Sequence, residues 1–106
     1  MFARTVSMRL KPKSVAEFTQ MIENKAIPVL RKQRGFQDEI TFVAAGGTEA
    51  IGISLWDHKE NADAYGHGAY PRVLKALENL VEGTPEVHTY EVSNSTFHKI
   101  AAPLAV

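Results

Sequence analysis

Residues 52–70 read GISLWDHKENADAYGHGAY and combine several structural signals in one short segment. A strand pattern ends on Trp56 and turns directly into a helix with polar residues at its start. That helix is interrupted by two glycines, Gly66 and Gly68, because glycine is a poor helix former. Pro71 then fits the first turn of a resumed helix, where its missing amide costs nothing. The segment therefore predicts a strand followed by a broken, two-part helix.

Working outward from this segment, the same patterns divide the rest of the chain into strands and helices. Apolar residues alternate with a period of two at residues 2–10, 36–45, 49–56 and 86–97, which predicts four strands. Helical spacing predicts a first helix at residues 15–33 and a second after Trp56. In the first helix we expect a capping box of Ser14 and Glu17, a kink or new turn at Pro28, and Gly35 as the C′ residue. Gly46-Gly47 predicts a tight hairpin, and Gly83-Thr84-Pro85 is expected to end the second helix.

The element order β-α-β-β-α-β predicts the fold class. Right-handed crossovers then favour a four-stranded antiparallel sheet with both helices on one face, an α+β fold of the ferredoxin-like type. We expect one such domain over residues 1–98. The strand Ile51 to Trp56 carries uncharged residues on both of its faces, so the sheet face without helices needs a cover. We therefore predict a homodimer with sheets packed face to face, and an apolar tail, residues 99–106, at the dimer interface.

Composition excludes several classes of function. The chain has 106 residues, with 12 basic and 12 acidic side chains and a formal net charge of zero, so we expect no nucleic-acid partner. It has no cysteine, which removes disulfides, thiolate catalysis and sulfur-ligated zinc. No apolar run is long enough to cross a bilayer and the N-terminus lacks a signal-peptide pattern, so we expect a cytoplasmic protein without a membrane partner.

Four short motifs make the chain resemble a known family. They are RKQRGF at residues 31–36, GISLWD at 52–57, ENADAY at 60–65, and Tyr70 with Pro71 before a leucine-rich helix. Together they resemble the antibiotic-biosynthesis-monooxygenase-like proteins, which are dimeric α+β barrels, over nearly the whole chain. The resemblance implies a ligand cavity between the sheet and the helices of each subunit. The family includes cofactor-independent monooxygenases of aromatic polyketides, haem-degrading monooxygenases, and members without an assigned reaction. The resemblance therefore leaves these three possibilities for the activity.

The haem-degrading branch of that family does not fit this sequence. The resemblance would require an asparagine in the first strand, where the chain offers Thr5 or Ser7. It would also require a tryptophan and a histidine in the second helix, at positions that here are closest to Tyr65 and Lys75. Because all three positions depart from the pattern, we reject haem degradation and expect no cofactor.

Five side chains are the candidate site residues. His67 is the predicted base, because it lies between two glycines and an imidazole titrates near neutral pH; the alternative is an exposed loop histidine. Tyr65 is the second predicted catalytic residue, whose hydroxyl could stabilise a phenolate. Trp56, Tyr70 and His88 are predicted to bind substrate, with structural packing as the alternative for the aromatic rings. No spacing of histidines and carboxylates predicts a metal site.

These residues support one main hypothesis and two alternatives. The main hypothesis is a cofactor-independent monooxygenase acting on a small aromatic, quinol-like molecule. An electron-rich phenolate can reduce dioxygen itself, so the protein needs only a base, orientation and a dry pocket. The alternatives are a non-catalytic small-ligand-binding or stress-related dimer of the same fold, and an isomerase on the same scaffold.

Overall fold

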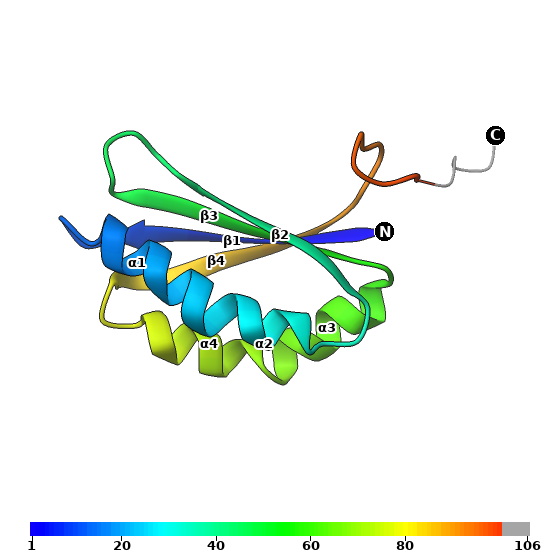
Figure 1. The fold of residues 1–106 in the computed structure, drawn as a ribbon, viewed down its shortest axis with the longest axis horizontal. Helices are drawn as coiled ribbons and strands as arrows, with labels where there is room; N and C mark the ends of the chain where they lie inside the picture. Colours follow the sequence, from blue (N-terminus) through cyan, green and yellow to red (C-terminus); the bar gives the residue numbers. More distant parts are fainter. Residues whose placement is uncertain (101–106) are drawn as a thin grey trace.

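The computed structural model describes residues 1–100 and contains one four-stranded sheet with helices on one side (Figure 1). The elements follow in the order β1 (Phe2–Leu10), α1 (Val15–Met21), η1 (Ile22–Ala26), α2 (Ile27–Arg31), β2 (Phe36–Val43), β3 (Glu49–Trp56), α3 (Lys59–His67), α4 (Tyr70–Leu77) and β4 (Val81–Glu91). The strands lie in the order β2-β3-β1-β4, and every neighbouring pair is antiparallel. The predicted ferredoxin-like α+β fold is therefore confirmed. The predicted placement of the apolar tail lies, from residue 101 onward, outside the described residues.

The first helical region is continuous but contains a π-helical turn. η1 widens the helix between α1 and α2, and the Ile27 amide donates to the Ile22 carbonyl, five residues back. Pro28 explains this widening, because it has no amide to donate and its ring would clash with the carbonyl four residues earlier. Of the two predicted effects of Pro28, a kink or a new turn, the structure shows the second, because Pro28 lies in the first turn of α2. The capping box is wrong: Ser14 makes no side-chain hydrogen bond at the start of α1.

Two glycines in turns adopt the left-handed conformation. Gly47 has φ 74° in the β2–β3 hairpin, where its amide donates to the Ala44 carbonyl, as the hairpin prediction required. Gly35 has φ 79°, but α2 ends at Arg31, so Gly35 is not its C′ residue. It lies instead in the turn that leads into β2.

Two strands depart from simple alternation. β2 is irregular between Phe36 and Asp38, so Phe36 faces the helices with Trp56, while Ile40 and Phe42 face away. Strict alternation over residues 36–45 predicts that Phe36 lies on the same face as Ile40. One extra residue in a strand moves the side chains of all preceding residues to the opposite face of the sheet. This irregularity is the physical reason why the predicted face of Phe36 is wrong.

β4 begins at Val81, five residues before the predicted start at residue 86. Gly83 and Pro85, expected to end a helix, lie inside this strand, where the pairing with β1 shifts between Ser7 and Arg9. β4 is an edge strand, and an edge strand tolerates proline and a bulge because one side of it pairs with no other strand.

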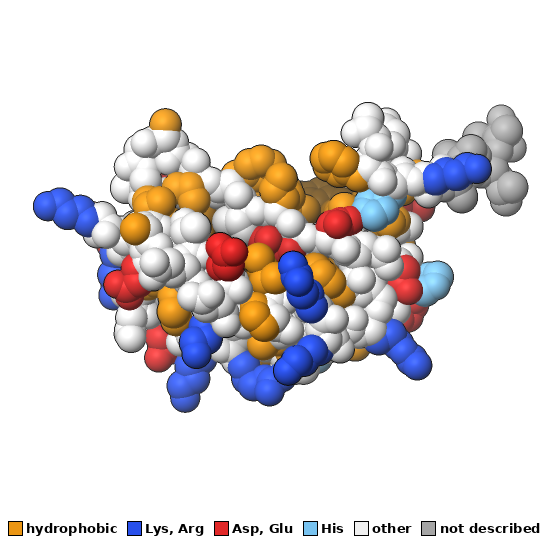
Figure 2. All heavy atoms as spheres, viewed as in Figure 1, with side chains coloured by type: hydrophobic (Ala, Val, Ile, Leu, Met, Phe, Trp, Pro, Cys, Tyr) orange, Lys and Arg blue, Asp and Glu red, His pale blue; other side chains and the backbone are white. Residues whose placement is uncertain are grey.

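The core lies between the sheet and the helices, and the opposite sheet face is exposed. The largest fully buried side chains of the core are those of Trp56, Phe18 and Leu10. Figure 2 shows hydrophobic side chains along the sheet side of the molecule, whereas lysines and arginines gather over the helices. Ile40, Phe42, Ile51 and Tyr90 are large hydrophobic residues exposed on the helix-free face. None of the helices within residues 1–100 is long and apolar enough to span a membrane.

Candidate functional site

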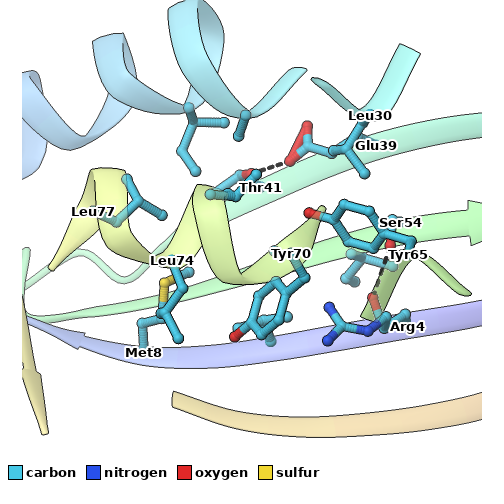
Figure 3. A pocket seen from close by; sticks show the side chains of 16 residues that line it. Arg4, Met8, Leu30, Glu39, Thr41, Ser54, Tyr65, Tyr70, Leu74 and Leu77 are labelled. Atoms are coloured by element: carbon cyan, nitrogen blue, oxygen red, sulfur yellow. Dashed lines mark hydrogen bonds between the residues drawn. The ribbon is translucent and has the colours of Figure 1, made fainter. Parts of the chain in front are cut away.

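A cavity lies between the sheet and the helices, above the middle of β1 and β3 (Figure 3). Its volume is about 60 Å³, and most of its wall is apolar, supplied in part by Met8, Leu30, Leu74 and Leu77. The π-helical turn contributes Ile22 and Ala26. An engineered cavity that admits benzene measures roughly 150 Å³. An aromatic ligand therefore requires movement of the partly exposed side chains at the rim, Tyr70 and Leu74.

Arg4 supplies the positive charge of the cavity. It points from β1 toward the helices and its residue surface is only 6% exposed. Its Cζ lies 4.0 Å from the ring centroid of Tyr70 and 5.3 Å from that of Tyr65. Burial lowers the pKa of Arg4, but a guanidinium titrates so high that it remains protonated in proteins. The cavity thus contains a permanent cation held against two aromatic rings.

The two tyrosines are hydrogen-bond donors rather than bases. Burial raises the pKa of Tyr65 to about 12, although the nearby Arg4 charge acts in the opposite direction. Burial also raises the pKa of Tyr70, again against the effect of Arg4. Both phenols are therefore protonated at neutral pH and can donate to a ligand oxygen.

Glu39 supplies the one carboxylate among the described residues that line the cavity. It lies on β2, is half-buried, and accepts a hydrogen bond from the Thr41 hydroxyl (Figure 3). Burial raises its pKa, while the Thr41 hydrogen bond acts to lower it. A carboxylate with a raised pKa accepts a proton more readily than an exposed one, so Glu39 is chemically suited to act as a base.

Trp56 and Ser54 support the cavity wall from behind. Trp56 is fully buried and its ring stacks on Tyr65, with centroids 5.2 Å apart. Its indole N–H donates to the Ser54 hydroxyl over 2.8 Å. The Ser54 hydroxyl in turn donates to the Arg4 carbonyl over 3.4 Å. Trp56 is therefore placed to orient Tyr65, and it does not itself line the cavity.

The structure brings together only part of the predicted set. Tyr65 and Tyr70 line the cavity, and their rings lie 6.0 Å apart. His67 is exposed at the last position of α3 and does not line the cavity. His88 is exposed on β4, pairs in register with Thr5, and lies on the helix-free face. Neither histidine is in contact with the cavity where the tyrosines meet.

Sequence reasoning missed four polar residues of the cavity: Arg4, Glu39, Thr41 and Ser54. Arg4 carried a signal, because it interrupts the apolar positions of the first strand on the side that faces the core. Glu39 carried none, because the irregularity in β2 decides its face. No group of three or more potential metal ligands occurs within residues 1–100.

Comparisons with known proteins give the fold but no family from sequence. No family model matches the chain, and no curated protein sequence matches it. Among solved structures, the chain is similar to a monooxygenase from the gene ActVA-Orf6 of Streptomyces coelicolor in complex with nanaomycin D. The TM-score is 0.73 at 17% identity, covering 92% of this chain and 92% of that one.

Two further structures are similar to the same extent. SnoaB, a cofactor-independent oxygenase from Streptomyces nogalater, has a TM-score of 0.72 at 15% identity, covering 90% of this chain and 95% of that one. NE2512, a protein of unknown function from Nitrosomonas europaea, has a TM-score of 0.74 at 17% identity, covering 96% and 95%.

The sheet order and the cavity define a ferredoxin-like α+β protein with a small, mostly apolar cavity under its helices. More particularly, the chain has the fold of solved structures described as antibiotic biosynthesis monooxygenases, such as those from Bordetella bronchiseptica (TM-score 0.73) and Deinococcus radiodurans (TM-score 0.71). The resemblance predicted from the sequence motifs is therefore confirmed at the level of the fold.

Proposed function

We propose that the protein is a cofactor-independent monooxygenase acting on a small aromatic, quinol-like compound. The observation that carries the proposal is the cavity between sheet and helices, where Glu39, Tyr65 and Tyr70 surround one apolar space. Two proteins of the same fold, a monooxygenase and a cofactor-independent oxygenase, support the same class of reaction.

The chemistry uses the substrate as its own reductant. A base removes a proton from the phenol or from the acidic CH₂ of its keto form, and the resulting anion passes an electron to dioxygen. The radical pair combines into a C–O bond, giving a peroxide that takes up a proton. Loss of water from the peroxide leaves a carbonyl, so CH₂ and O₂ become C=O and H₂O. The four electrons that reduce dioxygen all come from the substrate carbon.

Each residue of the cavity has a role in that sequence. Glu39 removes the proton, because it is the ionisable carboxylate at the cavity wall. Tyr65 and Tyr70 donate hydrogen bonds to the developing oxyanion, and Trp56 fixes the ring of Tyr65 by stacking. The apolar walls exclude water from the peroxide. His67, the base predicted from sequence, enters the test below as the competing candidate.

Turnover should depend on Glu39. With a naphthol- or anthrone-type substrate in an oxygen electrode, Glu39→Gln is expected to lower oxygen consumption roughly a hundredfold or more, the usual contribution of a general base. Because burial raises the pKa of Glu39, wild-type turnover should already fall with decreasing pH above the ordinary range of a glutamate, about pH 4.3. Lower pH protonates the base, so the loss is on the acid side.

His67→Ala is the matched comparison, since His67 is exposed outside the cavity. An unchanged rate would remove His67 from the mechanism. A rate unchanged in Glu39→Gln but lost in His67→Ala would reverse the assignment of the base.

A second candidate function is a binding protein without turnover. The exposure of His67 favours it, because the base predicted from the sequence does not line the cavity. A thermal-shift screen with aromatic ligands, followed by the oxygen electrode, separates the two functions: stabilisation without oxygen consumption supports binding. Turnover that persists under strict anaerobiosis would instead indicate isomerase chemistry.

We also propose that the protein forms a homodimer through the helix-free face of the sheet. Phe42 is 53% exposed there, and Ile40 and Ile51 lie on the same face. An apolar patch of this kind on a soluble domain is typical of a contact surface. A second copy presents the same patch, so a two-fold arrangement of sheets buries both at once.

The dimer should dissociate when its apolar surface is charged. We expect wild-type protein to sediment at twice the chain mass at micromolar concentration, and Phe42→Lys to sediment as a monomer, because a lysine buried between two sheets lacks a counter-charge. The control is Ala64→Lys, which adds the same charge at an exposed position of α3. A wild-type monomer, or a Phe42→Lys variant that stays dimeric, would contradict the proposed interface.

A further inference from the structure

Arg4 is a buried charge that the fold itself does not neutralise. It is 6% exposed, and none of the ion pairs among residues 1–100 includes it. Its guanidinium faces the cavity and lies over the rings of Tyr70 and Tyr65 (Figure 3). Arginine is almost never buried this deeply without a partner, so the position requires an explanation.

The neighbours compensate this charge only in part. The tyrosine faces attract a cation, but both phenols are neutral at physiological pH, so the net charge remains. Glu39 lines the same cavity from β2, on the far side of β3 from Arg4, and its carboxylate accepts from Thr41. Asp63, on α3, stabilises the positive charge of Arg4 through a Coulombic interaction, without forming an ion pair with it. Apart from its interaction with Tyr70, the guanidinium has no ion-pair partner among residues 1–100 and faces a mostly apolar space, so it is chemically prepared to receive an anionic oxygen.

We propose that Arg4 is a specificity-determining residue that makes the cavity select flat aromatic ligands carrying an ionised oxygen, either a phenolate or a carboxylate. This proposal rests on the proposed function only in that both place the ligand in the same cavity. Arg4 binds the negative oxygen, and the rings of Tyr65 and Tyr70 contact the aromatic plane. For a phenol, the same contact lowers the pKa of the bound ligand, because Arg4 binds the phenolate more tightly than the neutral phenol.

The test uses 4-nitrophenol, which has a single ring and whose phenolate absorbs visible light. Its absorbance is titrated against pH with and without wild-type protein. We expect the bound phenol to ionise about one pH unit lower than the free phenol, a tenfold preference for the anion. The methyl ether 4-nitroanisole, which cannot ionise, should bind at least tenfold more weakly. A third arm with 4-nitrobenzoate distinguishes carboxylate from phenolate recognition.

Three variants locate the effect. Arg4→Met keeps a long side chain without charge and should abolish the shift and the preference over the ether, whereas Arg4→Lys should retain part of both. Arg9→Met is the matched control, because Arg9 lies on the same strand but is exposed and faces away from the helices. It should behave as wild type. Circular dichroism checks that each variant is folded, and Arg4→Lys carries the test if Arg4→Met does not fold.

The outcomes separate this proposal from the proposed function. Equal binding of phenol and ether by wild type, no ionisation shift at millimolar probe, or a shift that persists in Arg4→Met would each overturn it. The measurement needs no oxygen and no turnover. A phenolate shift in a protein that consumes no oxygen would therefore support the anion site while removing the monooxygenase.

Discussion

Replacement of Gly35 by alanine is expected to lower the free energy of unfolding by about 3 kcal/mol. Gly35 has φ 79°, a conformation that costs an L-residue roughly 1–2 kcal/mol. A Cβ there would also lie inside van der Waals contact of Asp57 Oδ1 and Asn61 Nδ2, and overpacking adds roughly 1–3 kcal/mol. These two side chains are hydrogen-bonded to each other over 2.8 Å at the start of α3, so they cannot move apart freely. Denaturant unfolding followed by the fluorescence of Trp56 measures the change.

Gly46→Ala is the matched control for Gly35. Gly46 lies in the β2–β3 hairpin without a positive φ, and a Cβ there meets nothing within 4 Å. Its unfolding midpoint should stay within experimental error of the wild type. A Gly35→Ala variant as stable as Gly46→Ala would show that the contact between the β2 entry and the start of α3 is loose.

Trp56→Ala is expected to cost about 3–5 kcal/mol, the range for removing a fully buried large aromatic side chain. Trp56 has no exposed surface and its ring stacks on that of Tyr65. It also contacts Phe36 edge-on, with the two ring centroids 5.7 Å apart. Truncation leaves a void among these rings, and it removes the donor to the Ser54 hydroxyl. Thermal unfolding by circular dichroism measures the loss, since the variant has no tryptophan.

Trp56→Phe and Phe97→Ala bracket this prediction. Trp56→Phe keeps a ring against Tyr65 but loses the indole hydrogen bond, so its loss of stability should be smaller than that of alanine. Phe97 is 81% exposed, and its removal should leave stability nearly unchanged. A Trp56→Ala variant that unfolds at the wild-type temperature would mean that the ring cluster contributes little to the fold.

Local patterns predicted most of the architecture. Alternating and helical spacing located all four strands and both helical regions, and the break around Gly66 and Gly68 separates α3 from α4. These features depend on nearest neighbours along the chain, so they can be recognised without knowing the packing. The errors in the strands fall at β2 and β4, where an irregularity in strand pairing, decided by a neighbouring strand, changes register.

The candidate site was predictable only in part. Tyr65 and Tyr70 line the cavity as expected of pocket residues, whereas Trp56 supports them from behind and His67 is exposed. The glycines that flank His67 indicated backbone freedom, but the direction of its side chain depends on how α3 lies against the sheet. Sequence spacing contains no information on that direction.

By itself, the sequence determined the order of strands and helices, their sheet topology and the need to cover a second apolar face, since periodicity, turn residues and crossover handedness suffice for these. Only the tertiary structure decided that Arg4 and Glu39 line a common cavity, because they belong to β1 and β2, which β3 separates. The stretch from Gly52 to Tyr70 supplies the cavity with Ser54 and two tyrosines. The charges that give the cavity its chemistry come from other strands, and folding alone brings them together.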